Sequence, residues 1–214
     1  LLNEAERGRL PIVCTGLSLI HKAIIAASLH GHTGKRVVLI THDEATAAEL
    51  CGDINALGLK CLNFPARDLC IGDLSGYSKE YEHKRIDTLS AVADGAFDLL
   101  TISLDAAVQY TVKPEVLKSS RFTLKTGDSA DTSELAERLI NAGYTRSQLC
   151  EGSGQFSVRG GIFDLFPVNS EKPCRIEFWG DEIDSISYFD PETQRREENA
   201  DEIEISPAAE VMFD

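Results

Sequence analysis

The 214-residue sequence is poor in positive charge: 21 Lys and Arg stand against 35 Asp and Glu, a formal net charge of −14. Phosphate groups of nucleic acids and anionic membranes are bound by clustered basic side chains. The composition therefore argues against unassisted binding of DNA, RNA or anionic lipid. The length suffices for one large domain or two small ones, each with its own hydrophobic core.

Long apolar runs are missing as well. No stretch approaches the roughly 20 apolar residues of a membrane span, and no leader peptide precedes the first expected strand. We therefore expect a cytoplasmic protein that makes no membrane contact. The sequence begins at Leu1 rather than at Met, and we expect it to be part of a longer chain.

Paired metal-ligand spacings are also absent. The six cysteines include no CxxC pair, whereas zinc sites use such pairs. We expect buried free thiols at Cys14 and Cys61, which lie in apolar stretches, and no metal site. His30 and His32 could chelate a metal as an i, i+2 pair, but a solvated loop explains them more simply.

Strand and helix patterns alternate from Pro11 to about Asp105, which predicts an open, mostly parallel α/β sheet. Four short apolar runs are typical of strands: 11–16, 35–41, 59–65 and 97–103. Helical patterns follow them: 17–31, with Leu17, Ile20 and Ile24 on its apolar stripe, then 41–58, 79–95 and 104–110. The continuous apolar run in 35–41 indicates a strand covered on both faces. We assign residues 1–105 to this first domain.

A different pattern follows Pro114 and predicts an α+β domain over 106–191. A helix is expected over 131–143, with Asp131 as N-cap and Leu135, Leu139 and Ile140 as its apolar stripe. Short alternating runs separated by Gly, Asp and Pro predict an antiparallel sheet. "GQFSVRGGIFDLFP", 154–167, reads as two strands about a tight turn. The charged stretch 194–202 is expected to be a solvated connector, and 192–214 the start of a segment that returns to the first domain.

A phosphate-binding loop is the first enzymatic feature to test. It needs several glycines, whose N–H groups wrap the phosphates, then a Lys and a hydroxyl for charge and Mg²⁺. After the first expected strand, Thr15 and Gly16 are present. Ser18, Leu19 and Ile20 stand where the second Gly, the Lys and the hydroxyl would fall. We therefore predict a degenerate loop that binds no nucleotide.

No other catalytic constellation is recognisable. "GDLSG", 72–76, has the wrong spacing for a nucleophile elbow. Asp181 and Glu182 flank a glycine turn, where turn chemistry explains them. No Ser/His/Asp or Cys/His set can be assigned, so we favour a non-enzymatic role for this chain.

Two segments carry a specific resemblance. "YTRSQLCEGSGQFSVRGGIFDLFP" and "RIEFWGDEIDSISYFDPETQR" resemble the module shared by the excision-repair protein UvrB and the bacterial transcription-repair coupling factors, the Mfd proteins. "TGLSLIHKAIIAASL", "VVLITHDEATAAEL" and "NFPARDL" extend the similarity over nearly the whole chain. Three features favour the coupling factors over UvrB: the degenerate loop, the lack of room for a long aromatic hairpin between "FPARDL" and "KRIDTL", and Ser157 where UvrB-like sequences place an Arg.

The resemblance implies a degenerate RecA-like domain that has lost nucleotide binding, followed by a UvrB domain 2-like α+β domain. It implies that this second domain recruits UvrA in transcription-coupled nucleotide excision repair. RNA polymerase and double-stranded DNA would be bound by other regions of the full-length protein. ATP and Mg²⁺ would serve only a C-terminal translocase motor outside this chain.

The residues matched to the UvrA-docking surface are Arg146, Arg159 and Phe163. Arginine pairs bidentately with carboxylates, and arginine and aromatic residues are frequent interface hot spots. Each also has a simpler interpretation: Arg146 could pair only with Glu151, Arg159 could solubilise a turn, and Phe163 could belong to the core. The alternative function is an ATP-dependent DNA-repair helicase subunit related to UvrB, and a third possibility is a general protein-interaction scaffold.

Overall fold

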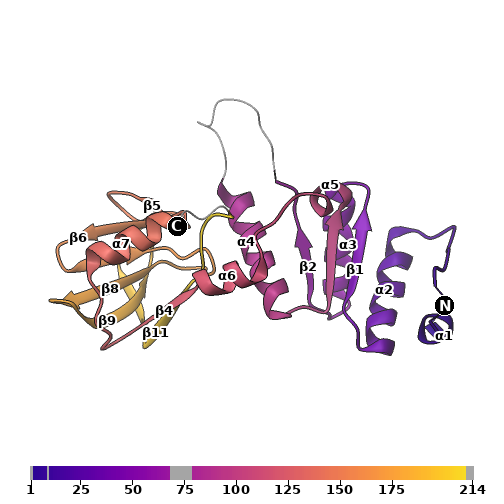
Figure 1. Ribbon diagram of the computed structural model, residues 1–214, viewed down its shortest axis with the longest axis horizontal. Helices are drawn as coiled ribbons and strands as arrows, with labels where there is room; N and C mark the ends of the chain where they lie inside the picture. Colours follow the sequence, from indigo (N-terminus) through magenta and orange to yellow (C-terminus); the bar gives the residue numbers. More distant parts are fainter. Residues whose placement is uncertain (1, 9, 68–78, 211–214) are drawn as a thin grey trace, which may run out of the picture. The chain divides into compact units, whose positions relative to one another are not determined.

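The computed structural model describes residues 2–8, 10–67 and 79–210 (Figure 1). The chain divides into two compact units. Unit 1 holds Leu1–Asp73 and Ala91–Tyr110, and unit 2 holds Leu74–Ser90 and Thr111–Asp214. The predicted mixed α/β class is confirmed, because the three-stranded sheet is parallel and the six-stranded sheet is mainly antiparallel. The predicted domain boundary at 105/106 differs from this division, since the chain leaves unit 1 twice.

Unit 1 combines helices with a three-stranded parallel sheet in the order β1-β3-β2. Its elements are α1 (Leu2–Glu6), α2 (Leu19–Thr33), β1 (Val37–Thr41), α3 (Glu44–Ala56), β2 (Cys61–Phe64), β3 (Leu99–Ser103) and α5 (Leu104–Ala107). Helix α4 (Lys79–Asp94) contributes its last turn to this unit and its longer first part to unit 2. The β-α alternation predicted from the sequence is therefore present from β1 onward.

The core of unit 1 lies between the sheet and α2 and α3. It is formed by Ala23, Ala26, Leu50, Cys51, Ile54, Cys61 and Leu99. Asp43 is the N-cap of α3, and its side chain accepts from Thr46 N. The hydroxyl of Thr41, where the helical pattern was expected to begin, donates instead to the backbone oxygen of Asp43.

Three expectations for unit 1 are wrong. Residues 11–16 form no strand. The buried stripe of α2 runs through its alanines, while Ile20 and Ile24 are 45% and 46% exposed. Strand β1 is covered on one face only: Val37 and Leu39 pack on the core, and Val38 and Ile40 are exposed. Successive strand residues face opposite sides of a sheet, so an unbroken apolar run did not require two covered faces.

Unit 2 is built on a six-stranded sheet in the order β10-β9-β8-β7-β6-β5, with a separate pair β11-β4. The elements are α6 (Pro114–Ser120), β4 (Phe122–Lys125), α7 (Thr132–Asn141), β5 (Thr145–Arg146), β6 (Gln155–Arg159), β7 (Ile162–Leu165), β8 (Cys174–Trp179), β9 (Glu182–Phe189), β10 (Arg196–Ala200) and β11 (Glu202–Ile205). All neighbours in the large sheet are antiparallel except β5 and β6.

The core of unit 2 lies against α7, whose Leu135 and Leu139 are buried, whereas Ile140 is 51% exposed and was wrongly placed on the stripe. Asp131 caps α7 as predicted, accepting from Ser133 N and Glu134 N.

The expected connector 194–202 contains strand β10, and β10 and β11 both pair within unit 2 rather than returning to unit 1. Among the described residues, no helix has the length and hydropathy needed to cross a bilayer.

Candidate docking surface

The β6–β7 hairpin has the tight glycine turn that the sequence predicts. Arg159 and Ile162 are partners across the two strands, with Gly160 and Gly161 between them. Gly160 adopts a left-handed φ of 61°, which side chains disfavour. A Cβ on Gly161 would lie 2.9 Å from the backbone oxygen of Phe178 in β8. Both glycines are therefore needed, one for the turn and one for the close approach of the next strand.

Phe163 is a core residue, which corrects its assignment as a surface anchor. Its exposed fraction is 0%, and it packs with Phe156, Leu165 and Ile176 in the core of unit 2. The alternation of the hairpin places Phe163 opposite Val158, on the same face as Phe156. This is the simpler interpretation that the sequence left open. Phe163 stabilises the hairpin from its core side and has no exposed surface for a partner to contact.

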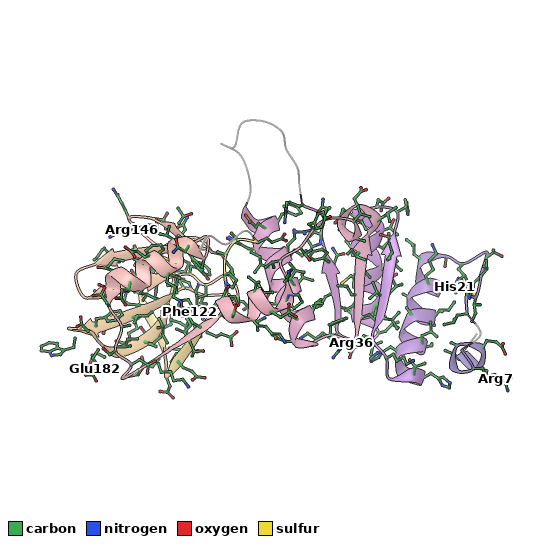
Figure 2. The ribbon with its side chains drawn as sticks, in the orientation of Figure 1. Arg7, His21, Arg36, Phe122, Arg146 and Glu182 are labelled. Atoms are coloured by element: carbon green, nitrogen blue, oxygen red, sulfur yellow. The ribbon has the colours of Figure 1, made fainter. Side chains whose placement is uncertain are left out.

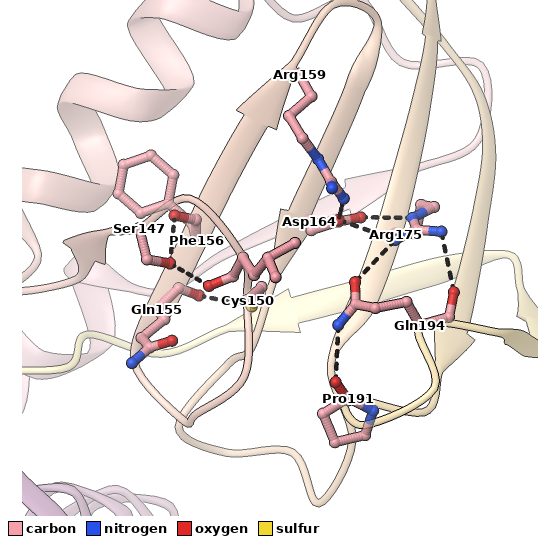
Figure 3. Close-up of polar contacts among 10 residues, drawn as sticks. Ser147, Cys150, Gln155, Phe156, Arg159, Asp164, Arg175, Pro191 and Gln194 are labelled. Carbon is pink, nitrogen blue, oxygen red and sulfur yellow. Dashed lines mark hydrogen bonds and ion pairs between the residues drawn. The ribbon is translucent and has the colours of Figure 1, made fainter.

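Arg159 lies at the end of β6 with 45% of its side chain exposed. Its Nη2 donates to Oδ2 of Asp164 on β7 at 2.5 Å. Arg159 is therefore neither a free surface cation nor a buried one: it is anchored at one nitrogen and open to solvent elsewhere (Figure 3).

Asp164 and Arg175 were not identified from the sequence. The Asp164 side chain is 0% exposed, and it also accepts from Nε and Nη2 of Arg175 on β8, at 2.6 and 3.0 Å. Figure 3 shows Asp164 between the two guanidinium groups. The signal that could have revealed the cluster is the single acid in the apolar run "IFDLF", since a buried carboxylate requires cationic partners.

Arg146 lies on β5, an edge strand of the large sheet, and is exposed. In the described part of the chain its guanidinium forms no ion pair, so the predicted alternative of a pair with Glu151 is not realised. Figure 2 shows its side chain extending away from the sheet. Strand β5 is held by hydrogen bonds from Thr145 N to Gly154 O and from Ser147 N to Phe156 O.

The two arginines do not share one face of the sheet. Arg146 is level with Phe156, which faces the core, whereas Arg159 is three residues further along β6 and faces the opposite side. A partner that contacts both must therefore approach along the β5 edge. An edge strand offers unpaired backbone groups in addition to side chains.

The loop between β5 and β6 buries a thiol beside the charged cluster. Cys150 is fully buried, and its Sγ donates to Gln155 O at 3.3 Å. Burial, and to a smaller extent the nearby Asp164 carboxylate, raises the pKa of this thiol to about 12. Cys150 is therefore a protonated packing residue rather than a nucleophile.

The region of the predicted degenerate phosphate loop lies in unit 1. Gly16 has a φ of 73° and Ser18 is the N-cap of α2, with its Oγ 2.9 Å from His21 Nδ1. Leu19 and Ile20 form the first turn of the helix. Because no strand precedes Gly16, the strand–loop–helix geometry of a phosphate-binding loop is not formed here.

The other candidate ligands fall outside any site. His30 and His32 belong to α2 rather than to a loop, and His30 Nδ1 lies 2.8 Å from Lys35 O. No group of three potential metal ligands occurs among the residues that the structure describes. Cys14 is exposed, contrary to expectation, and Cys61 is buried as predicted. Two sequence features lie outside the described residues: Cys70 and the segment "GDLSG". The same holds for most of the stretch between "FPARDL" and "KRIDTL", where we expected no room for the UvrB hairpin.

Comparison with known proteins identifies a domain family that is similar to this part of the chain. Residues 122–211, which begin at β4 and contain the whole six-stranded sheet, match the family described as the UvrB interaction domain. The part of the chain that holds Arg146, Arg159 and Asp164 therefore lies within the residues matched to that family.

The similarity extends beyond the domain to particular proteins. The chain is 32% identical over 216 residues to the transcription-repair-coupling factor of Bacillus subtilis (strain 168), which covers 100% of this chain and 18% of that protein. It is 32% identical over 208 residues to the factor of the same name from Staphylococcus aureus (strain USA300), covering 96% and 18%. The predicted resemblance to the transcription-repair coupling factors is confirmed. The chain spans 18% of the length of these relatives.

Proposed function

We propose that this chain is the UvrA-recruiting module of a transcription-repair coupling protein, and that unit 2 carries the contact. The observation that carries the proposal is the match of residues 122–211 to the UvrB interaction domain. The chemistry of the surface supports it: exposed guanidinium groups lie on the edge strand β5 and at the end of the adjacent strand β6, in a chain whose net charge is −14. Local arginines can pair with acidic groups of a protein, whereas the whole chain repels nucleic acid.

The docking contact is proposed to use Arg146 and Arg159, with Phe163 as internal support. In the full-length protein, other regions would engage RNA polymerase and double-stranded DNA, and this module would then present UvrA with a UvrB-like surface beside a stalled polymerase. The first unit is proposed to be a degenerate RecA-like domain without catalytic activity. Its substituted loop residues Ser18, Leu19 and Ile20 support this view.

The test is direct binding between the chain and purified UvrA, measured by calorimetry and size-exclusion chromatography. We expect a complex that is weakened by Arg146→Ala and by Arg159→Ala while the circular dichroism spectrum is unchanged. Arg7→Ala, which removes an exposed arginine of unit 1, is the matched control and should bind as the unmodified chain does. Absence of a complex would reject the proposal.

The alternative of an ATP-dependent helicase subunit is separated by a nucleotide titration. We expect no Mg-ATP binding by the chain, because bulky side chains occupy the positions where bare backbone and a Lys are required. Measurable Mg-ATP affinity would favour the helicase.

A further inference from the structure

Arg159 belongs to a charged cluster of three side chains on three adjacent strands. Arg159 on β6, Asp164 on β7 and Arg175 on β8 face the side of the sheet opposite to Phe156. One carboxylate faces two guanidinium groups, so the cluster retains one positive charge. The two oxygens of Asp164 are used unequally: Oδ1 accepts from Arg175 alone, and Oδ2 accepts from both arginines.

The inner arginine is held from several sides. The guanidinium of Arg175 lies 4.7 Å from the centre of the Phe189 ring. Its nitrogens also donate to the backbone and side-chain oxygens of Gln194, each at 3.4 Å. Gln194 is fixed in turn, with a φ of 59° and a hydrogen bond from its amide to Pro191 O at 2.8 Å. The hydrogen bond to Asp164 raises the pKa of Arg175, which therefore stays charged.

Each side chain of the cluster is held in place by contacts with its neighbours. Phe189 and Gln194 fix Arg175, and Arg175 fixes the buried carboxylate of Asp164. Asp164 then holds only one terminal nitrogen of Arg159, and 45% of that side chain is exposed. The remaining N–H groups of this planar fork are thus offered to the outside in a defined orientation.

We propose that Asp164 is a positioning residue for partner binding, which presets Arg159 to donate its outer N–H groups to a carboxylate of the partner. The proposal rests on the docking function above. It adds that Asp164 orients the contact and that Arg159 recognises a carboxylate of the partner. A long side chain that is ordered before binding loses less entropy on binding. A guanidinium can bridge two carboxylates at once, which the ammonium group of a lysine cannot do in the same geometry.

The variant Asp164→Asn separates positioning from simple attraction between charges. It removes a negative charge beside Arg159, so electrostatics alone predicts tighter binding to an acidic surface. Positioning predicts the opposite, a loss of about 3- to 10-fold in affinity for UvrA. Asp184→Asn is the matched control: it makes the same change in charge at an exposed position of β9 and should leave the affinity unchanged.

Arg159→Lys keeps the proposal testable if Asp164→Asn folds poorly, and a double variant tests the coupling between the two residues if it folds. Arg159→Lys retains the exposed charge, and we expect it to bind about as weakly as Arg159→Ala. In an Arg159→Ala background, Asp164→Asn should change the affinity by less than about 2-fold, because the orienting partner is already absent.

The outcomes distinguish this proposal from the docking function itself. If Asp164→Asn binds UvrA as tightly as the unmodified chain or more tightly, or if Arg159→Lys retains full affinity, positioning is rejected while docking stands. An equal loss from Asp164→Asn with and without Arg159 would assign Asp164 a general structural role and also reject positioning. If the unmodified chain does not bind, the docking function fails first.

Discussion

Phe156 and Phe163 stack across the two strands of the β6–β7 hairpin, with ring centroids 5.5 Å apart and planes inclined by 3°. Neither side chain is exposed. The pair lies on the core side of the same hairpin that carries Arg159 on its other side. The buried aromatic pair therefore stabilises the hairpin backbone that carries Arg159. Substitutions on the two faces can test stability and partner binding separately.

Phe163→Ala should destabilise unit 2 by about 3–5 kcal/mol, since it removes a fully buried ring and leaves a cavity. The free energy of unfolding in urea measures this. Ile162→Ala, at the neighbouring exposed position, should change it by less than about 0.5 kcal/mol. An unchanged stability for Phe163→Ala, together with lost binding, would restore Phe163 as a surface anchor.

Arg85 and Glu210 form a buried ion pair in unit 2. Their side chains are 1% and 3% exposed, and Arg85 Nε lies 2.6 Å from Glu210 Oε1. Arg85→Ala should cost about 3–5 kcal/mol in unfolding free energy, because it removes the cation of a buried ion pair. Lys84→Ala, at an exposed position of the same helix, is the control and should have little effect. Equal stability of the two variants would show that the pair contributes nothing.

The stability of unit 2 should fall in alkaline solution. Burial raises the pKa of Cys150 from 9.0 to about 12, and it also raises the pKa values of Cys174 and Tyr144. The folded state therefore keeps protons that the unfolded chain releases, and stability present below pH 9.0 is lost as the pH rises towards 12. Each group contributes at most about 1.4 kcal/mol per pH unit.

Urea unfolding under reducing conditions at several pH values between 7 and 11 measures this dependence. Cys150→Ala should reduce the alkaline slope relative to the unmodified chain. A stability that stays constant or rises above pH 9.0 would contradict the assignment of these groups as buried and protonated.

The hairpin and its turn were predictable because local chemistry dictates them. Two alternating runs around Gly160 and Gly161 specify a tight turn, and the capping side chain of Asp131 specifies the start of α7. The burial of Phe163 was left open, since alternation shows which residues share a face but not which face is covered. The covering helix α7 supplies that information only in three dimensions.

Other features depend on distant partners and could not be inferred locally. The charged residues of β10 form a strand because β9 offers an edge to pair with. The apolar residues 11–16 form none, because propensity alone supplies no neighbouring strand. Asp164 and Arg175 meet only through the register of β7 with β8, which the sequence does not specify.

The most direct test of the docking account is calorimetric titration of UvrA with the unmodified chain and with the Arg146→Ala/Arg159→Ala double variant. We expect saturable binding by the first and at least about 30-fold weaker binding by the second, with matching thermal unfolding curves. Equal affinities of the two proteins, or no binding by the unmodified chain, would contradict the assignment of this edge as the UvrA-docking surface.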